Sequence, residues 1–213
     1  MIRYEEFIKK ISEEFAEHSI IPADDFPNMR LYSDQVVGFI NSELSLYGKS
    51  GGDVLTKTML SNYVKNELLP PPEKKKYDKE QMVMLELILC LKNAYKMDDI
   101  KTLMKPFVDS RKDAFDEGVN FTELYEKLEP IYAEKRKEMA EGLIKDIDVV
   151  KDALRDTGLN DDDMTEMFLY IMIIAMQIDT AKFIGKTLIR EYYGNKGDDP
   201  KKSGKSAKKK SKK

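Results

Sequence analysis

The sequence predicts an all-α protein in which a helix-turn-helix or winged-helix-like N-terminal domain precedes a helical C-terminal bundle. Apolar residues recur at spacings of three and four along most of the chain, as in amphipathic helices. The composition is rich in the helix formers Glu, Lys, Leu and Met. One helical stretch runs directly into three prolines and three lysines. We therefore expect an N-terminal helix, a winged-helix-like domain, a helical bundle and a disordered Lys-rich tail over residues 1–19, 20–108, 109–193 and 194–213.

Composition excludes several classes of protein. The 213 residues, 41 % hydrophobic and 35 % charged, suffice for one substantial domain or two small ones. One Cys and one His exclude an intrachain disulfide and leave no basis for a Cys/His zinc site, so no metal or cofactor is expected. The N-terminus is charged from the start and shows no signal sequence, so we expect a cytoplasmic protein.

Charge is distributed unevenly along the chain. The net charge is −3, but residues 194–213 carry nine Lys against two Asp, which leaves −10 for the first 193 residues. Within this acidic body, residues 56–105 have ten Lys against seven acidic residues, whereas residues 1–55 have five basic and ten acidic residues. A basic island of this kind is typical of directed nucleic-acid binding.

Two helices are expected before the basic island. The first, over about residues 2–18, has an apolar face made of Tyr4, Phe7, Ile8, Ile11 and Phe15. Ser33 is a suitable N-cap for the second, over about 34–46, whose inward residues are Val36, Val37, Ile40 and Leu44. The turn at 49–53 contains two glycines but lacks the spacing of a phosphate-binding loop.

The helix expected over residues 56–66 carries most of the candidate DNA contacts. Its packed face comprises Leu55, Met59, Leu60, Tyr63 and Val64. The other positions hold hydroxyls, amides and lysines, which suit a major groove because Thr, Ser and Lys reach phosphates and Asn can pair with adenine. The candidates on this helix are Thr56, Lys57, Thr58, Ser61, Asn62, Lys65 and Asn66. The same residue types also describe a helix face that meets only water, and that alternative stays open here.

A rigid basic turn follows this helix. The three prolines at 70–72 stop the helix, because proline lacks an amide donor and disfavours the αR conformation in the residue before it. Three cations and an aromatic ring come next, which resembles a wing that grips the DNA backbone. These further candidates are Lys74, Lys75, Lys76 and Tyr77.

Two helices complete this domain. Asp78 and Gln81 form a start similar to a capping box for a helix over about 79–94. That helix is apolar on most sides, so we expect it to be the central core helix. A shorter helix after Lys96 turns four apolar residues inward, namely Ile100, Leu103, Met104 and Phe107.

The segments IPADDFPNMRLYSDQV, LTKTMLSNYVKNELLPPPEKKKYDKEQ and MDDIKTLM resemble an uncharacterised bacterial family, domain of unknown function 1836. The resemblance covers Ile20 to about Val108, and no biochemical activity is established for the family. The same region is similar, more distantly, to the DNA-binding head of mercury-resistance-regulator (MerR) type transcription factors.

The MerR-type resemblance rests on the order of the elements. A helix, a second helix, Leu68-Leu69-Pro70, a basic wing, a helix and a short helix at Asp98–Lys101 follow one another as in that class. The first turn, Ser45–Val54, is longer than in that class, and the wing is shorter and carries lysines where arginine is usual. The resemblance implies a winged-helix DNA-binding head.

The second half of the chain is helical and acidic. Phe121, Leu124, Tyr125 and Leu128 form one face, and Pro130 is expected to begin a new helix that runs to about Asp156. This helix is either half of a coiled-coil pair or an ordinary bundle helix, because both have an apolar stripe such as Met139, Leu143, Ile147, Val150 and Leu154.

The last helix contains ten consecutive apolar residues, Met167–Met176, which are too few to span a bilayer. A helix that is apolar all round must be buried in its own domain or against a second subunit, although a Met-rich surface can also form an adaptable ligand pocket. We expect core plus a homodimer interface, and no membrane. The Lys-rich tail is either a basic arm or a solubilising segment.

Together these features favour a dimeric, sequence-specific DNA-binding transcriptional regulator. Thr58, Asn62 and Asn66 are the candidates for base edges, and the lysines are the candidates for phosphates. The alternative is a non-catalytic protein-interaction module that has lost DNA binding, which the charge of −10 outside the tail favours. No nucleophile–base pair, phosphate loop or metal cluster indicates an enzyme.

Overall fold

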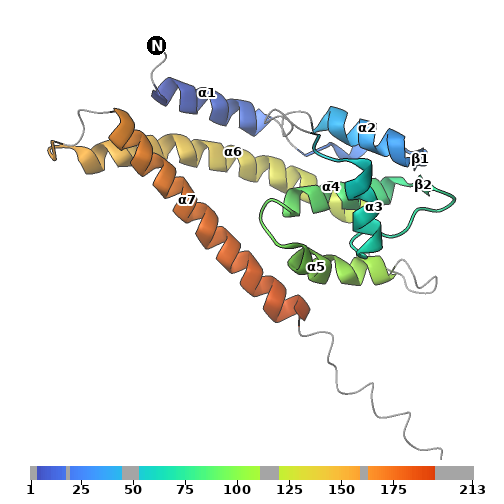
Figure 1. The fold of residues 1–213 in the computed structure, drawn as a ribbon. Helices are drawn as coiled ribbons and strands as arrows, with labels where there is room; N and C mark the ends of the chain where they lie inside the picture. Colours follow the sequence, from blue (N-terminus) through green and yellow to red (C-terminus); the bar gives the residue numbers. More distant parts are fainter. Residues whose placement is uncertain (1–3, 18–19, 45–52, 111–119, 159–162, 195–213) are drawn as a thin grey trace, which may run out of the picture.

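A computed structural model describes residues 4–17, 20–44, 53–110, 120–158 and 163–194. Within these ranges the chain is mostly helical, with a sheet of two short strands, which confirms the all-α class (Figure 1). The predictions for the Ser45–Val54 turn and for the Lys-rich tail concern residues that lie largely outside these ranges. The α-helices are α1 (Tyr4–Glu17), α2 (Ser33–Glu43), α3 (Lys57–Lys65), α4 (Lys79–Leu91), α5 (Met97–Ser110), α6 (Phe121–Leu154) and α7 (Asp163–Leu188). Shorter elements are a 3₁₀ turn η1 (Ala23–Asp25), strands β1 (Leu31–Tyr32) and β2 (Lys76–Tyr77), and a π-helical turn η2 (Ile189–Tyr193).

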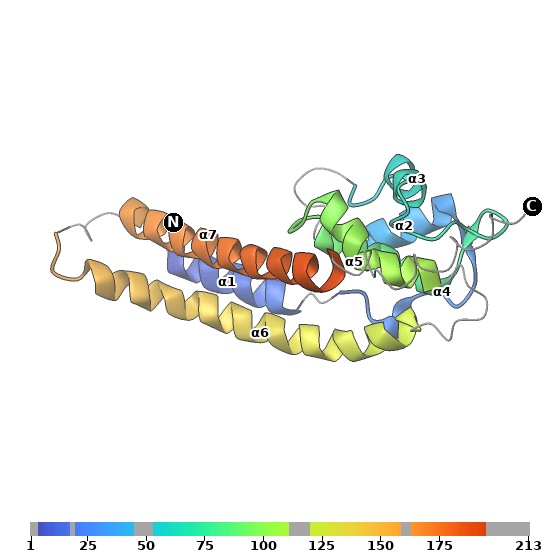
Figure 2. The ribbon, with the colours of Figure 1, turned by 90° about the horizontal axis from the view of Figure 1, so that it is seen from below.

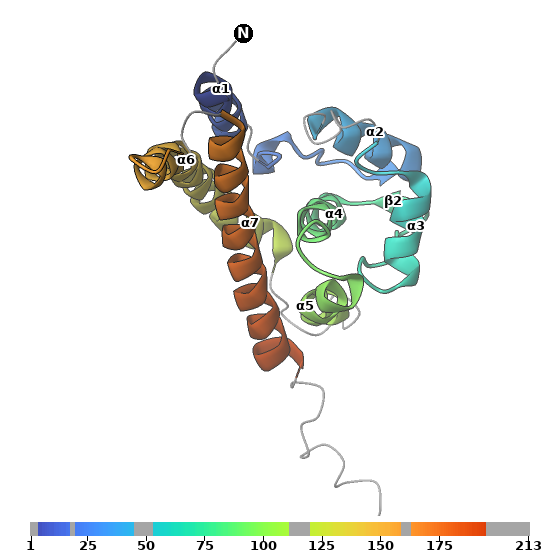
Figure 3. The ribbon, with the colours of Figure 1, turned by 60° about the vertical axis from the view of Figure 1, so that its left-hand side comes forward.

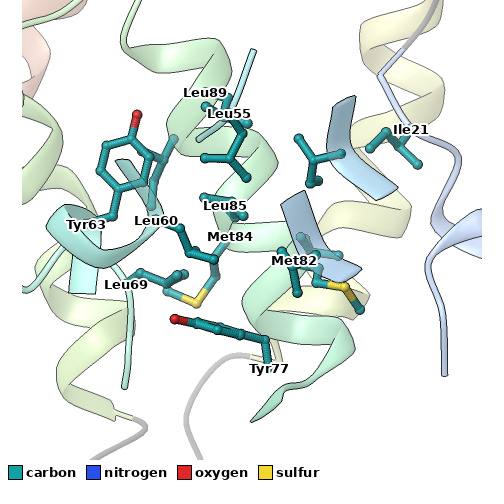
Figure 4. Close-up of a cluster of buried hydrophobic side chains, with 14 of the residues drawn as sticks. Ile21, Leu55, Leu60, Tyr63, Leu69, Tyr77, Met82, Met84, Leu85 and Leu89 are labelled. Atoms are coloured by element: carbon teal, nitrogen blue, oxygen red, sulfur yellow. The ribbon is translucent and has the colours of Figure 1, made fainter. Parts of the chain in front are cut away.

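Helix α4 is the centre of a head that α2, α3, α5 and the two strands surround (Figure 3). Met82, Val83, Met84 and Leu85 follow one another in the sequence and are all fully buried, so every side of the helix is covered. This confirms the prediction of a central core helix. Side chains from the surrounding segments complete the core, among them Ile21, Leu55, Leu60, Tyr63, Leu69 and Tyr77 (Figure 4).

A two-stranded antiparallel sheet closes one end of the head. Leu31 pairs with Tyr77, and Tyr32 pairs with Lys76. Because β1 ends where α2 begins and β2 ends just before α4, the pairing holds the starts of these two helices together. The Lys76 ammonium also lies 4.8 Å from the centre of the Tyr32 ring, a cation–π contact across the same pair.

Helices α1, α6 and α7 form a second unit, in which α1 lies along α6 and α7 crosses it (Figures 1 and 2). Its small core joins the three helices through Tyr4, Ile8, Ile147, Val150, Leu154 and Tyr170. The apolar stripe of α6 is therefore largely covered by helices of the same chain. Tyr4 also hydrogen-bonds the Glu166 carboxylate at the start of α7.

The structure corrects the expected helix break at Pro130. Helix α6 continues through this residue from Phe121 to Leu154. Pro130 is exposed, so the carbonyl group that its missing N–H leaves free can bond water. The helix instead begins with Asn120, whose side chain accepts hydrogen bonds from the backbone N–H groups of Thr122 and Glu123 at 3.0 and 3.3 Å.

The core of the head extends past residue 108, where the sequence analysis ended that domain. Phe121 and Tyr125, in the first turns of α6, are buried in the same cluster as α4. The rings of Phe107 and Phe121 meet edge to face, with centroids 4.9 Å apart. The start of α6 thus belongs to the head, and the rest of α6 belongs to the second unit.

Glu86 of α4 is fully buried and connects three distant segments. It accepts a hydrogen bond from the Ile21 backbone N–H at 2.7 Å. The Tyr125 hydroxyl oxygen lies 2.5 Å from Glu86 Oε2 and 2.7 Å from the Ile21 carbonyl oxygen. Each of these two contacts joins two oxygen atoms and needs a proton to be a hydrogen bond. The Tyr125 hydroxyl supplies one of the two protons. We infer that Glu86, when protonated, supplies the other by donating to Tyr125, which then donates to the Ile21 carbonyl. Burial likewise raises the pKa of Glu86 to about 7.

Replacing Glu86 by Gln should remove a pH-dependent loss of stability. Above pH 4.5 the unfolded chain releases the Glu86 proton while the folded chain retains it, so folding weakens until both forms are ionised above about pH 7. Glu86→Gln keeps the hydrogen bonds and cannot ionise. Its free energy of unfolding, measured with urea, should gain about 3 kcal/mol on the wild type between pH 4.5 and pH 8. The exposed Glu126→Gln change is the control, and parallel profiles for Glu86→Gln and wild type would contradict a neutral Glu86.

Candidate nucleic-acid interface

Helix α3 presents a polar face to solvent because its other face is anchored in the core. Leu60 and Tyr63 are buried, and Met59 and Val64 are partly buried against the same cluster. The predicted packed face is therefore present. The opposite side of the helix is exposed and consists of Lys57, Thr58, Ser61, Asn62, Lys65 and Asn66.

Both ends of α3 are closed by local hydrogen bonds. At the start, the Thr56 hydroxyl accepts a bond from the Met59 N–H at 3.2 Å, so Thr56 is the N-cap. At the end, the Leu68 and Glu67 N–H groups bond the Tyr63 and Val64 carbonyls, in the pattern of a Schellman motif. Glu67 has the left-handed conformation that this motif usually gives to glycine, with φ 60°.

The position of α3 depends on two polar side chains that sequence reasoning missed. The Asn41 amide of α2 donates to the Leu55 carbonyl at 2.8 Å and accepts from the Leu55 N–H at 3.0 Å. Lys92, just after α4, donates to the Val54 carbonyl at 3.0 Å. The segment just before α3 is thus held from two sides. No spacing rule could reveal this, because it joins residues on different helices.

The lysine turn is a tight hairpin. Glu73 and Lys76 form an antiparallel bridge, and the Lys76 N–H bonds the Glu73 carbonyl at 2.9 Å. Lys74 and Lys75 between them both have positive φ, 49° and 66°, as in a type I′ turn. That turn type favours Asn-Gly, so two lysines here are conformationally unfavourable. Both side chains are exposed. The turn leads into β2, which lies on the same side of α4 as α3 does (Figure 3).

Buried Gln81 fixes the root of this turn to α4. Its side-chain oxygen accepts from the Asp78 N–H at 2.9 Å, and Asp78 in return accepts from the Gln81 N–H at 2.9 Å. The predicted capping box is therefore confirmed. The Gln81 amide also donates to the Pro70 and Pro71 carbonyls, both at 3.0 Å. The sequence revealed the cap but not this second role.

Two candidate contact residues have structural roles instead. The side chain of Tyr77, in β2, is buried in the core of the head, so its ring cannot stack against DNA (Figure 4). Its side chain alternates with that of Lys76 across the strand, and the sheet therefore directs one of the two inward. The Thr56 hydroxyl is occupied as the N-cap of α3.

Acidic side chains lie beside several of the basic ones. Lys57 pairs with Asp34 at 2.7 Å, which lowers the pKa of that carboxyl through their hydrogen bond. Arg30 pairs with Glu73, and Lys101 pairs with Glu67 at 3.1 Å. All six side chains are exposed, so these pairs are weak and an incoming phosphate can replace the acid. Lys65, Lys74 and Lys75 form no ion pair with another described residue.

A groove of about 240 Å³ between α1 and α6 is a separate feature. It is lined mainly by apolar side chains, including those of Ile11, Phe15 and Met139. The Arg136 guanidinium lies 4.0 Å from the centre of the Phe15 ring. Across the described ranges, no cluster of His, Cys, Asp and Glu could hold a metal ion.

These observations define a small helical head that presents one exposed polar helix beside a basic hairpin. The sequence profile of a family described as domain of unknown function (DUF1836) matches residues 21–128, just over half of the 213 residues. The chain belongs to this family. The match reaches into α6, in agreement with the burial of Phe121 and Tyr125 in the head. Comparisons with curated proteins and with solved structures found no match.

Replacing Lys74 and Lys75 by Asn and Gly should stabilise the head. The pair Asn-Gly adopts positive φ at little cost, so the change relieves the unfavourable conformation of the turn. We expect the free energy of unfolding in urea to rise by about 1 kcal/mol. The control Lys74→Gln/Lys75→Gln removes the same charges and keeps the conformational cost. An equal gain in this control would mean that charge repulsion, and not the backbone, limits stability.

Proposed function

We propose that the protein is a sequence-specific DNA-binding transcriptional regulator that acts as a dimer. In this proposal the head is a winged helix similar to that of MerR-type factors, α3 enters the major groove and the lysine hairpin is the wing. The observation that carries the proposal is the exposed polar face of α3, together with the exposed Lys74-Lys75 turn that leads into β2 on the same side of the head (Figure 3). Two lysines held in a conformationally unfavourable turn favour a functional surface over one that meets only water.

The residues have different roles in the proposed complex. Thr58 and Asn62 are the candidates for base edges, and the Asn62 amide can bond the N6 and N7 atoms of adenine. Asn66 joins them only after rotation, since its amide now donates to the Asn62 carbonyl at 2.9 Å. Lys57 and Lys65, with Ser61 between them one turn from each, are the candidates for phosphates on one side of the groove.

The hairpin supplies the second set of phosphate contacts. Lys74 and Lys75 are exposed, whereas Lys76 is half-buried against the Tyr32 ring. The first two lysines are therefore the stronger candidates. Lys57 can exchange Asp34 for a phosphate, since their ion pair is exposed and the phosphate carries more charge.

The acidic surface favours a second candidate, a protein-interaction module that does not bind DNA. Outside the tail the chain carries −10, and Asp34, Glu67 and Glu73 lie beside the basic residues of the head. The two candidates differ in their response to salt. Each phosphate contact lowers the slope of log affinity against log salt by roughly one unit, whereas a predominantly apolar protein contact is less sensitive.

Selection from random duplexes should enrich a two-fold-related motif with half-sites about one helical turn apart. The protein for this experiment ends at Tyr193, because the Lys-rich tail would add sequence-independent binding. Asn62→Ala/Lys65→Ala should weaken binding to the selected site at least about thirtyfold by fluorescence anisotropy. Lys135→Ala, an exposed lysine of α6, is the matched control and should bind as the wild type does.

The wing can be tested with a variant whose folding is not weakened. Lys74→Asn/Lys75→Gly should bind the selected site less tightly and reduce the salt slope by about two units, even if its unfolding free energy rises. Binding no tighter than that to random DNA, and equal in all variants, would exclude α3 as a reading helix and leave the interaction module.

A further inference from the structure

Helix α7 and the groove between α1 and α6 both expose apolar side chains in a single chain. Helix α7 with its continuation has the length and composition of a membrane-crossing helix, yet 6 % of its most apolar window is buried. Burial of the last helix within its own domain, one of the two arrangements expected from the sequence, is therefore wrong. One side of α7 contacts α6 through Tyr170 and the head through Gly185, which packs closely on Tyr95. The groove differs from the uncovered side of α7 because two polar side chains, Ser12 and Arg136, are buried in it.

The groove is fixed at both ends by hydrogen bonds between elements. At one end the Arg136 guanidinium of α6 donates to the Phe15 carbonyl in the last turn of α1. At the other end the Leu143 carbonyl of α6 accepts a bond from the Tyr170 hydroxyl of α7 at 3.0 Å. The hollow is therefore part of the packed second unit.

Small side chains make the floor of the groove and large ones make its rim. Ser12 and Ala140 are buried, whereas Ile11, Phe15 and Met139 are exposed. The volume is about 240 Å³. This volume is that of about eight water molecules in the liquid, so it suits a ligand of about ten non-hydrogen atoms.

The Ser12 hydroxyl is available to a ligand in the groove. The hydroxyls of Thr102, Thr180 and Thr187, which also lie within helices, each donate to the carbonyl four residues earlier at 2.9 Å. Ser12 forms no such bond and has no other hydrogen-bond partner within the described part of the chain, although its side chain is only 7 % exposed. A polar group buried to this extent is normally hydrogen-bonded. A hydrogen-bond acceptor bound in the groove would satisfy it.

Arg136 places a positive charge beside the same part of the groove. Its side chain is 5 % exposed, and its guanidinium lies 4.0 Å from the centre of the Phe15 ring and 5.5 Å from that of Tyr132. The rings attract a cation, but neither they nor the Phe15 carbonyl carries a compensating charge. Phe15 follows Ser12 by one turn of α1, so the guanidinium and the hydroxyl lie at neighbouring levels of the groove.

The chemistry of the lining therefore selects an amphipathic anion. One guanidinium balances a single negative charge, which a carboxylate carries and a doubly charged phosphate exceeds. The two carboxylate oxygens can accept from Ser12 and from Arg136 at once. The rest of the lining is apolar and suits a hydrocarbon tail, as in most small-molecule sites.

We propose that the groove binds a small carboxylic acid with an apolar tail. The carboxylate lies between the Ser12 hydroxyl and the Arg136 guanidinium, and the tail lies along Ile11, Met139 and Leu143. This site goes beyond the proposed function and does not depend on DNA binding, since every residue that lines it belongs to the second unit.

Isothermal titration calorimetry of the full chain with octanoate, which has ten non-hydrogen atoms, tests the ligand class. We expect a dissociation constant below about 1 mM. Octylammonium has the same tail and the opposite charge, and it should bind at least about tenfold more weakly. Acetate reports on any binding of a bare carboxylate to the Lys-rich tail and should give no measurable heat. Octanoate that binds no more tightly than octylammonium would overturn the proposal.

Variants test the position of the site. Ala140→Leu fills the floor and should weaken octanoate binding at least about tenfold, whereas Ala181→Leu, at an exposed position of α7, is the matched control. Ser12→Val should bind about tenfold more weakly than Ser12→Thr, which has nearly the same shape and keeps the hydroxyl. Circular dichroism verifies the fold of each variant. Octanoate binding that Ala140→Leu leaves unchanged would place the ligand elsewhere and contradict the proposal.

Sedimentation equilibrium distinguishes a second copy of the chain as the occupant. Octanoate should leave the mass of the protein unchanged, because the ligand and not another chain fills the groove. A chain that takes up no octanoate and whose self-association is weakened by Ala140→Leu would assign the groove to a second copy, and the proposal would be wrong.

Discussion

The buried carboxyl group of Glu86 connects three segments of the head. It lies in the central helix of the head and reaches both the Ile21 backbone, on the segment from α1, and the Tyr125 side chain of α6. Because Ile21 follows α1 and Tyr125 lies in the first turns of α6, these contacts fix the two points at which the head continues into the second unit. A buried carboxylate would be costly at this position, and a neutral carboxylic acid satisfies every partner.

The candidate DNA-binding face of α3 is exposed because residues outside this face hold the helix in place. Leu60 and Tyr63 anchor the helix in the core, Asn41 holds the segment before it, and a Schellman motif ends it. None of these contacts uses the outer face. The lysine hairpin is held in a similar way, since Gln81 and Tyr77 fix its base while Lys74 and Lys75 remain exposed. A rigid scaffold that holds the exposed polar side chains in place is what groove recognition requires.

The excess of basic residues is confined to one part of the head, residues 56–105, and does not follow the division into two units. The acidic body would repel DNA, so the basic residues of the head would be the part that approaches it. Several of those residues are already paired with exposed acids, which limits nonspecific attraction at low cost. The exposed apolar side chains of α7 lie on the second unit, away from α3 (Figure 1).

Local sequence determined the helices, their caps and the faces they bury. The spacing of apolar residues predicted α1, α4 and the packed side of α3, because 3.6 residues per turn places such residues on one stripe. It also indicated the capping box at Asp78 and the basic turn. Tertiary contacts decided the rest. Helix α6 continues through Pro130 because the position is exposed, Tyr77 is buried because the strand directs it inward, and Asn41 and Glu86 matter only through residues distant in the sequence. The apolar run of α7 was evident from sequence, but only the fold decided which of its sides stays uncovered, because the packing of α6 and Tyr95 selects the other one.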